Sequence, residues 1–175
     1  MQQGLVHIYC GNGKGKTTAS VGLCTRAAGR GLRVLFAQFL KADDSGERDA
    51  LRSFENVTVL DLPEKLKFVR SMTDEEFAKT KDYFSAQFQR CAACAKNGEY
   101  DLIVLDEICS TVGHGIVSVP ELAALIREKA PGTELVLTGR DPAPEIVELA
   151  DYVTEMTLVK HPFQQGIPAR KGIEY

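Results

Sequence analysis

The stretch Leu5-Val-His-Ile-Tyr9, followed after Cys10 by Gly11-Asn-Gly-Lys-Gly-Lys-Thr17, decides the fold. Its apolar first half is typical of a buried strand. Residues 18–30, which follow the glycines, carry apolar side chains at helical spacing and end at Gly29-Arg-Gly31. A strand, a glycine-rich loop and a helix in this order predict a phosphate-binding loop.

The residue types in this loop suit a nucleotide triphosphate. Glycines let successive backbone N–H groups turn inward into an anion-binding nest, and the helix that follows points its positive end at the same place. Lys16 would add an ammonium, and Thr17 would offer a hydroxyl to Mg²⁺. The usual spacing G-x-x-x-x-G-K-[ST] would put the first glycine at Cys10, so Gly11 comes one residue late. The alternative is a glycine-rich turn before a core helix; the two flanks and the Lys-Thr pair favour the nucleotide site.

Length and composition predict an ordinary globular protein. A chain of 175 residues is typical of one domain, and its 44% hydrophobic and 26% charged residues are average values. No stretch reaches the ~18 apolar residues of a membrane span, and a strand so near the start leaves no room for a signal peptide, so we expect a cytoplasmic location and no membrane partner. The net charge is −3 and the basic residues are scattered, which argues against a nucleic-acid partner.

The cysteines and histidines do not predict a metal centre. Five cysteines is an odd number, and reduced thiols are expected in a chain of this size. Cys91-Ala-Ala-Cys94 has no second pair for zinc and lies within a predicted helix, so we interpret these cysteines as structural. His7, His114 and His161 are too dispersed for a metal triad.

The remaining pattern alternates strands and helices. Further strands are predicted at 33–40, 57–60, 100–107, 134–138 and 152–157, and helices at 73–98, 118–130 and 142–149. Residues 41–48 form a polar loop that either flanks the site or is a solvated connector, and residues 61–72 are typical of a mobile cover. We therefore predict an α/β fold with a mainly parallel, roughly six-stranded sheet and helices on both faces, as in RecA-like P-loop NTPases.

Two further motifs end strands at the edge where ligands bind in parallel sheets. The strand within residues 100–107 delivers Asp106 and Glu107, of which Asp106 would assist Mg²⁺ directly or through water and Glu107 would be a base or a second metal contact. Arg140 follows the strand at 134–138 and is placed to pair with phosphate; the alternative is a salt bridge with a nearby acid.

Taken together, the sequence resembles the P-loop corrinoid adenosyltransferases. The resemblance is carried by seven segments: residues 11–18, 38–41, 104–108, 135–140, 150–156, 160–163 and 169–175. The last of these, Ala169-Arg-Lys-Gly-Ile-Glu-Tyr175, is the most specific because generic P-loop proteins lack it. The late first glycine of the loop is also a feature of that family.

The resemblance implies a particular reaction. The enzyme binds ATP with Mg²⁺ (or Mn²⁺) and a corrinoid co-substrate reduced to Co(I). Cobalt attacks the 5′ carbon of the ribose, and triphosphate leaves from an ATP that is seated in reverse relative to other P-loop enzymes. A homodimer and a flavoprotein-type reductant are further expectations. The tail, residues 159–175, is expected to pack near the site or against a partner subunit of a single-domain protein.

The expected site residues fall into four groups. The catalytic set is Lys16, Thr17, Glu107 and Arg140; the nucleotide set is Gly11, Asn12, Gly13, Lys14, Gly15, Lys16, Thr17, Thr18 and Arg26; the metal set is Thr17, Asp106 and Glu107. Lys14 and Arg26 are implied by the resemblance, as are the corrinoid contacts, Phe68 and an Arg70 that stands where some relatives have tryptophan. The rival functions are a generic P-loop kinase or ATPase and a non-catalytic nucleotide-binding module.

Overall fold

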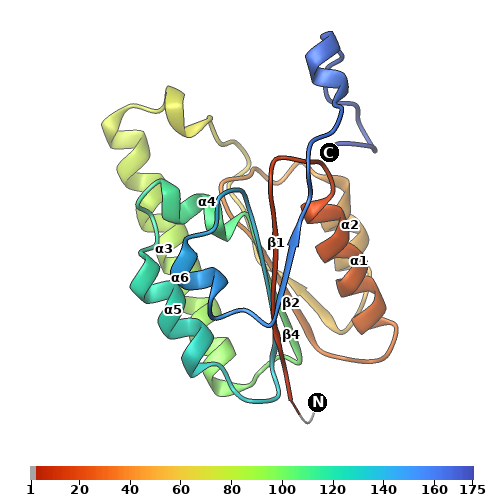
Figure 1. Ribbon diagram of the computed structural model, residues 1–175, viewed down its shortest axis with the longest axis vertical. Helices are drawn as coiled ribbons and strands as arrows, with labels where there is room; N and C mark the ends of the chain where they lie inside the picture. Colours follow the sequence, from red (N-terminus) through yellow and green to blue (C-terminus); the bar gives the residue numbers. More distant parts are fainter. Residues whose placement is uncertain (1–2) are drawn as a thin grey trace.

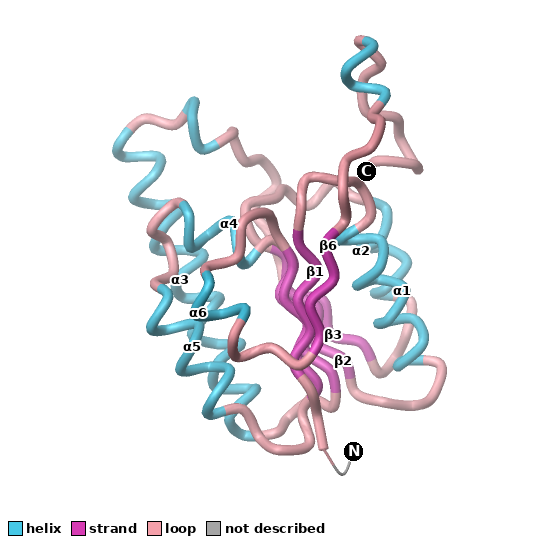
Figure 2. The backbone as a smooth tube through the Cα atoms, in the orientation of Figure 1, coloured by secondary structure: helices cyan, strands magenta, loops and turns pink. Residues whose placement is uncertain are grey.

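The computed structural model describes residues 3–175 as a three-layer α/β/α sandwich (Figures 1 and 2). Its centre is a six-stranded sheet in the order β3-β2-β4-β5-β1-β6, and every strand pair is parallel. The strands are β1 Val6–Cys10, β2 Val34–Gln38, β3 Val57–Val59, β4 Leu102–Asp106, β5 Glu134–Thr138 and β6 Tyr152–Glu155. The predicted α/β class and the predicted parallel sheet are confirmed.

Burial explains why these segments form strands. Every residue of β2 and β4 is buried, since helices cover both faces of a parallel sheet. The edge strand β6 is exposed at all four positions. All strands end at the same edge of the sheet, the upper edge in Figure 1, from which the C-terminal tail extends. That edge is where ligand sites of such sheets are found.

Helices cover both faces of the sheet (Figure 1). On the first face lie α1 Lys16–Ala28 and α2 Gly46–Arg52. On the second lie α3 Asp74–Asn97, α4 Ile108–Gly113, α5 Val119–Glu128 and α6 Pro144–Val147. Short 3-10 turns are found at Val69–Ser71 and Pro162–Gln165. The core is accordingly split into two apolar clusters, one on each side of the sheet.

The helix ends follow the sequence signals. Thr73 and Glu76 form a reciprocal capping box at the start of α3, and Ser118 and Glu121 form another at the start of α5. Helix α3 ends at Asn97 and is capped by Gly98, whose φ of 66° suits glycine. Both predicted starts and the predicted end of α3 are confirmed.

Three segments differ from the prediction. Residues 41–48 are not all loop, because α2 begins at Gly46, with Glu47 and Asp49 in its first turn, where they stabilise the helix dipole. Helix α4 was not predicted, since six residues are too few to show a helical period. The tail, predicted without regular structure, contains the 3-10 turn at Pro162–Gln165.

Candidate active site

The glycine-rich loop, residues 11–15, joins β1 to α1 at the carboxyl edge of the sheet. Gly11 and Gly15 have φ of 91° and 121°, which side chains rarely allow. The backbone N–H of Gly13 donates to the carbonyl oxygen of Met156 at 2.6 Å. A Cβ on Gly13 would lie 2.5 Å from that same oxygen. Glycine is therefore required where the loop meets the segment after β6.

The Lys16 side chain contacts the backbone of this loop. It is buried, and its Nζ donates to the carbonyl oxygens of Gly11 at 2.7 Å and Gly13 at 2.9 Å. Burial lowers the pKa of Lys16, while the negative charge of Glu107 opposes that shift. The loop is thus already curled around an ammonium group.

Asp106 is the centre of the polar network at the strand ends. Its side chain is 0% exposed and accepts hydrogen bonds from four neighbours. The Oγ1 of Thr17 lies 3.0 and 3.1 Å from the two carboxylate oxygens, and the Oγ1 of Thr138 donates at 2.7 Å. The side-chain amide of Gln38 donates at 3.2 Å and the Nζ of Lys41 at 2.9 Å. This carboxylate is fixed in position and directed at the first turn of α1.

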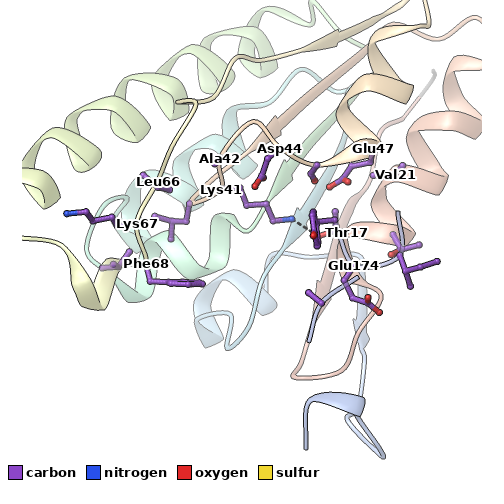
Figure 3. Close-up of a pocket in the computed structure, with 18 of the residues that line it drawn as sticks. Thr17, Val21, Lys41, Ala42, Asp44, Glu47, Leu66, Lys67, Phe68 and Glu174 are labelled. Atoms are coloured by element: carbon purple, nitrogen blue, oxygen red, sulfur yellow. Dashed lines mark hydrogen bonds between the residues drawn. The ribbon is translucent and has the colours of Figure 1, made fainter. Parts of the chain in front are cut away.

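Lys41 reaches Asp106 from the segment after β2. Its Nζ also donates to the Oγ1 of Thr17 at 3.2 Å, as the dashed line in Figure 3 marks. The preceding residue, Leu40, has a φ of 55°, which is unusual for leucine. One lysine therefore bridges the P-loop threonine and the aspartate of β4.

Arg48 contacts this network through Gln38. Its guanidinium is fully buried and forms an ion pair with Asp43. It also donates to the Oε1 of Gln38 at 3.2 Å and to the carbonyl oxygen of Leu60 at 2.7 Å. Gln38, held in this way, presents its amide to Asp106. The start of α2 is thereby connected to the site.

A cavity of about 1530 Å³ opens over these residues. That volume exceeds the roughly 300–1,000 Å³ typical of small-molecule sites. Figure 3 shows Leu66, Lys67 and Phe68 on the opposite side of the cavity from Thr17 and Glu174. The lining comes from α1, from the segments after β2 and β3, from the ends of α4 and β5, and from the tail: Thr17, Thr18, Val21, Leu40, Lys41, Ala42, Asp44, Ser45, Gly46, Glu47, Leu66, Lys67, Phe68, Val69, Arg70, His114, Arg140, Phe163, Ala169, Gly172, Ile173, Glu174 and Tyr175.

The structure brings several residues expected in the site to this cavity. Thr17, Thr18 and Arg140 line it from the P-loop side and the end of β5. Phe68 and Arg70 line it from the segment before α3, and the Phe68 side chain is 89% exposed. The residues proposed for nucleotide and corrinoid thus face a common space.

Several expected site residues are not among those that line the cavity, namely residues 11–16, Arg26, Asp106 and Glu107. Arg26 is in the last turn of α1, at the opposite end of the helix from Lys16, about 15 Å along the axis. It is outside the cavity because the helix runs away from the phosphate loop. Glu107 has a φ of 63°, and its Oε2 accepts a hydrogen bond from Ser110 at 2.6 Å. This carboxylate is held by the first turn of α4 and is not among the cavity-lining residues in the described part of the chain.

The tail contacts the phosphate loop through one ion pair. The Nζ of Lys14 lies 3.6 Å from the Oε1 of Glu174, and Arg170 pairs with the same oxygen at 3.1 Å. Lys14 and Asn12 are exposed. Six tail residues, among them Phe163 and Tyr175, line the cavity.

Lys41, Gln38, Thr138 and Arg48 were not expected in the site from the residues alone. A signal existed for three of them, since Gln38 and Thr138 are polar ends of buried strands and Lys41 follows such an end. Arg48 gave no signal, because a lone arginine in a polar segment predicts an exposed side chain.

All five cysteines are free and buried, as the structural interpretation expects. Cys91 and Cys94 lie within α3. Among residues 3–175, no group of three or more His, Cys, Asp or Glu side chains is arranged to hold a metal ion. No helix in this described part is long and apolar enough to cross a membrane.

Residues 2–175 match the family described as ATP:corrinoid adenosyltransferase BtuR/CobO/CobP. This chain belongs to that family. Similar proteins include the corrinoid adenosyltransferases of Pseudomonas aeruginosa, 34% identical over 99% of this chain and 85% of the relative, and Escherichia coli K12, 30% identical over 99% and 87%. The corrinoid adenosyltransferase CobA of Salmonella typhimurium is 31% identical over 99% and 87%.

A solved structure supports the fold. A KaiC-like protein from Pyrococcus horikoshii superimposes with a TM-score of 0.55 over 91% of this chain and 75% of its own, at 18% identity. At that identity the likeness concerns fold alone. It agrees with the RecA-like P-loop architecture predicted for this member of the adenosyltransferase family.

Proposed function

We propose that this protein transfers the 5′-deoxyadenosyl group of ATP to the Co(I) centre of a corrinoid. The observation that carries the proposal is the family match over residues 2–175. The site geometry supports it, because Thr17 and Thr18, directly after the phosphate loop, line a cavity of about 1530 Å³, and Thr17 donates to the buried Asp106. A cavity of this size has room for more than a nucleotide.

The reaction requires charge stabilisation and positioning. The electron pair of Co(I) forms the cobalt–carbon bond at C5′, the C5′–O bond breaks, and its electrons leave with triphosphate. Because the leaving group is a polyanion, fixed N–H groups and cations are the main stabilisation that a protein can supply. In-line placement of C5′ and cobalt supplies the rest. The nucleophile carries no proton, so no general base is needed.

We assign the triphosphate to the phosphate loop, with the bonding groups supplied by residues 11–18. Lys16 is the central cation, and Arg140 is a second cation on the cavity wall. Lys14 is exposed beside the loop and can exchange its partner Glu174 for phosphate. Arg26, outside the cavity, has no direct role in this assignment.

The residues present fit a Mg²⁺ or Mn²⁺ ion. Thr17 and Asp106 offer a hydroxyl and a carboxylate within hydrogen-bond distance of each other, and the Lys41 ammonium already lies against both oxygens as a cation. Mg²⁺ uses one or two protein oxygens together with phosphates and water, so a larger protein cluster is not required. The metal would neutralise charge on the triphosphate. Glu107 has one carboxylate oxygen, Oε2, already engaged by Ser110.

We place the corrinoid against Phe68 and Arg70, opposite the phosphate loop. Phe68 is an exposed aromatic on the cavity wall, suited to contact a flat macrocycle. Arg70 can stack on such a surface through its planar guanidinium. We further expect a flavoprotein-type reductant to supply Co(I). A homodimer is also expected, and the exposed Tyr152 and Val153 on the edge strand suit a protein contact.

The experiment mixes the protein, MgATP and chemically reduced cobalamin and follows the light-sensitive alkylcobalt absorbance spectrum. We expect that spectrum to form together with intact triphosphate. Steady release of ADP and single phosphates without a corrinoid would instead identify a P-loop kinase or ATPase.

A further inference from the structure

Lys41 occupies an unexpected position for a lysine next to a phosphate loop. Its ammonium donates to the Oδ2 of Asp106 at 2.9 Å and to the Oγ1 of Thr17 at 3.2 Å. These are the two groups assigned above to a divalent cation. In Figure 3 the Lys41 side chain extends from the cavity wall directly to Thr17. The lysine and a metal ion therefore compete for the same oxygens.

Burial makes this cation necessary. The Asp106 side chain is 0% exposed, and an ionised carboxylate in such surroundings is costly unless it is paired. Lys41 is its ion-pair partner among the described residues. The Lys41 side chain is 30% exposed, so its ammonium borders the cavity and has space into which it can move.

The backbone directly before Lys41 has an uncommon conformation. Leu40 adopts a φ of 55°, a conformation that leucine rarely takes. The residue before it, Phe39, is buried and donates its N–H to the carbonyl oxygen of Asp106 at 2.9 Å. The chain thus leaves β2 tied to Asp106 and turns sharply, directly before the lysine that pairs with the same residue.

We propose that Lys41 is the internal counter-ion of the metal position, and that a divalent cation displaces its ammonium into the cavity to pair with the triphosphate. Two cations at hydrogen-bond distance from the same carboxylate repel, so metal binding and the Lys41–Asp106 pair exclude each other. A metal ion alone must break that pair without compensation. A metal ion with a triphosphate gives the displaced ammonium a new anionic partner, so the two ligands bind cooperatively. The pairing of the displaced ammonium with triphosphate rests on the proposed function.

The first test measures Mn²⁺ binding to nucleotide-free protein from the electron paramagnetic resonance signal of free Mn²⁺. We expect Lys41→Met to bind Mn²⁺ about tenfold more tightly than the unmodified protein. Lys67→Met is the matched control, because Lys67 lines the same cavity but pairs with Glu76, and we expect no change there. Equal Mn²⁺ affinity in Lys41→Met and the unmodified protein would overturn the proposal.

The second test needs no variant and so does not depend on the folding of Lys41→Met. The protein is treated briefly with acetic anhydride, and acetylation of each lysine is measured by mass spectrometry with and without saturating Mn²⁺. We expect Mn²⁺ to raise the labelling rate of Lys41 several-fold and to leave that of Lys67 unchanged. A Lys41 rate that does not respond to Mn²⁺ would show that the ammonium is not displaced.

A third measurement addresses cooperativity. Inorganic triphosphate should increase Mn²⁺ affinity more in the unmodified protein than in Lys41→Met, because only the former has an ammonium to transfer. Equal enhancement in both proteins would refute the phosphate pairing. None of these measurements uses a corrinoid or turnover. They can therefore support the role of Lys41 even if adenosyl transfer fails, and they can refute that role even if adenosyl transfer occurs.

Discussion

Single side chains at the strand ends are held by several partners each. Asp106 accepts hydrogen bonds from Thr17, Thr138, Gln38 and Lys41, and together these partners restrict the rotation of its side chain. The carboxylate is therefore oriented before any ligand binds. Such preorganisation is what electrostatic stabilisation of a leaving triphosphate requires.

At this scale, Lys16→Ala should reduce adenosyl transfer by about 100-fold or more, because it removes the central cation of the phosphate loop. It also removes the bonds to the carbonyl oxygens of Gly11 and Gly13, so ATP affinity measured by calorimetry should fall too. Lys65→Ala, at an exposed position outside the cavity lining, is the control. Near-normal alkylcobalt formation by Lys16→Ala would show that the loop has another role.

At the scale of elements, the phosphate loop depends on a distant strand. Its glycines could be predicted from the sequence, because a strand, a loop and a helix in succession are local signals. The reason why position 13 must be glycine could not be predicted, since the carbonyl oxygen that Gly13 contacts belongs to Met156, which follows the last strand. Arg48 was missed for a similar reason. Its partners Gln38 and Leu60 come together only in the folded protein.

Gly13→Ala should destabilise the protein by about 1–3 kcal/mol and weaken ATP binding. The added Cβ would lie 2.5 Å from the oxygen and 2.8 Å from the carbon of the Met156 carbonyl, and backbone atoms cannot give way cheaply. Gly22→Ala is the matched control within α1: its Cβ meets nothing within 4 Å, so it should stabilise the helix by up to about 1 kcal/mol. Urea unfolding measures both, and equal stabilities would contradict the packing argument.

Arg48→Met should cost about 3 kcal/mol of unfolding free energy. Methionine fills much of the space but leaves the acceptors of Gln38 and Leu60 buried and unpaired, at about 1–3 kcal/mol each. Arg52→Met removes a half-exposed partner of the same Asp43 and should cost less than about 1 kcal/mol. Urea unfolding curves compare the two. If Arg48→Met costs no more than Arg52→Met, the buried network contributes little.

For the molecule as a whole, the layered architecture could be predicted and the site only in part. Apolar runs that alternate with helical patterns predict a parallel sheet. The sequence shows six such runs, and each corresponds to a strand of the six-stranded sheet. The carboxyl edge follows from the topology, which is why Asp106 and Arg140 were expected there, whereas Thr17 was expected from the phosphate-loop motif. The distance of Arg26 from the phosphate loop depends on the length of α1. The place of Glu107 at the start of α4 depends on its own left-handed backbone conformation. Sequence motifs encode neither property.

The buried thiols predict how the stability of the whole protein depends on pH. Burial raises the pKa of Cys24, Cys91 and Cys109 from 9.0 to about 12 each. Below pH 9 these thiols are protonated in both the folded and the unfolded chain, so their contribution is fully present. Above pH 9 the unfolded chain loses protons that the folded chain retains, and each thiol should remove about 1.4 kcal/mol of unfolding free energy per pH unit.

Urea unfolding between pH 8 and pH 11 measures this loss, although lysines and tyrosines titrate in the same range. A variant isolates the thiol contribution, because it changes one titrating group and leaves the others in place. Cys91→Ala lowers the stability at pH 8 through the smaller side chain, but its further decline above pH 9 should be shallower than that of the unmodified protein by about 1.4 kcal/mol per pH unit. Parallel declines would mean that the Cys91 thiol ionises as readily in the core as in the unfolded chain, which its complete burial in α3 argues against.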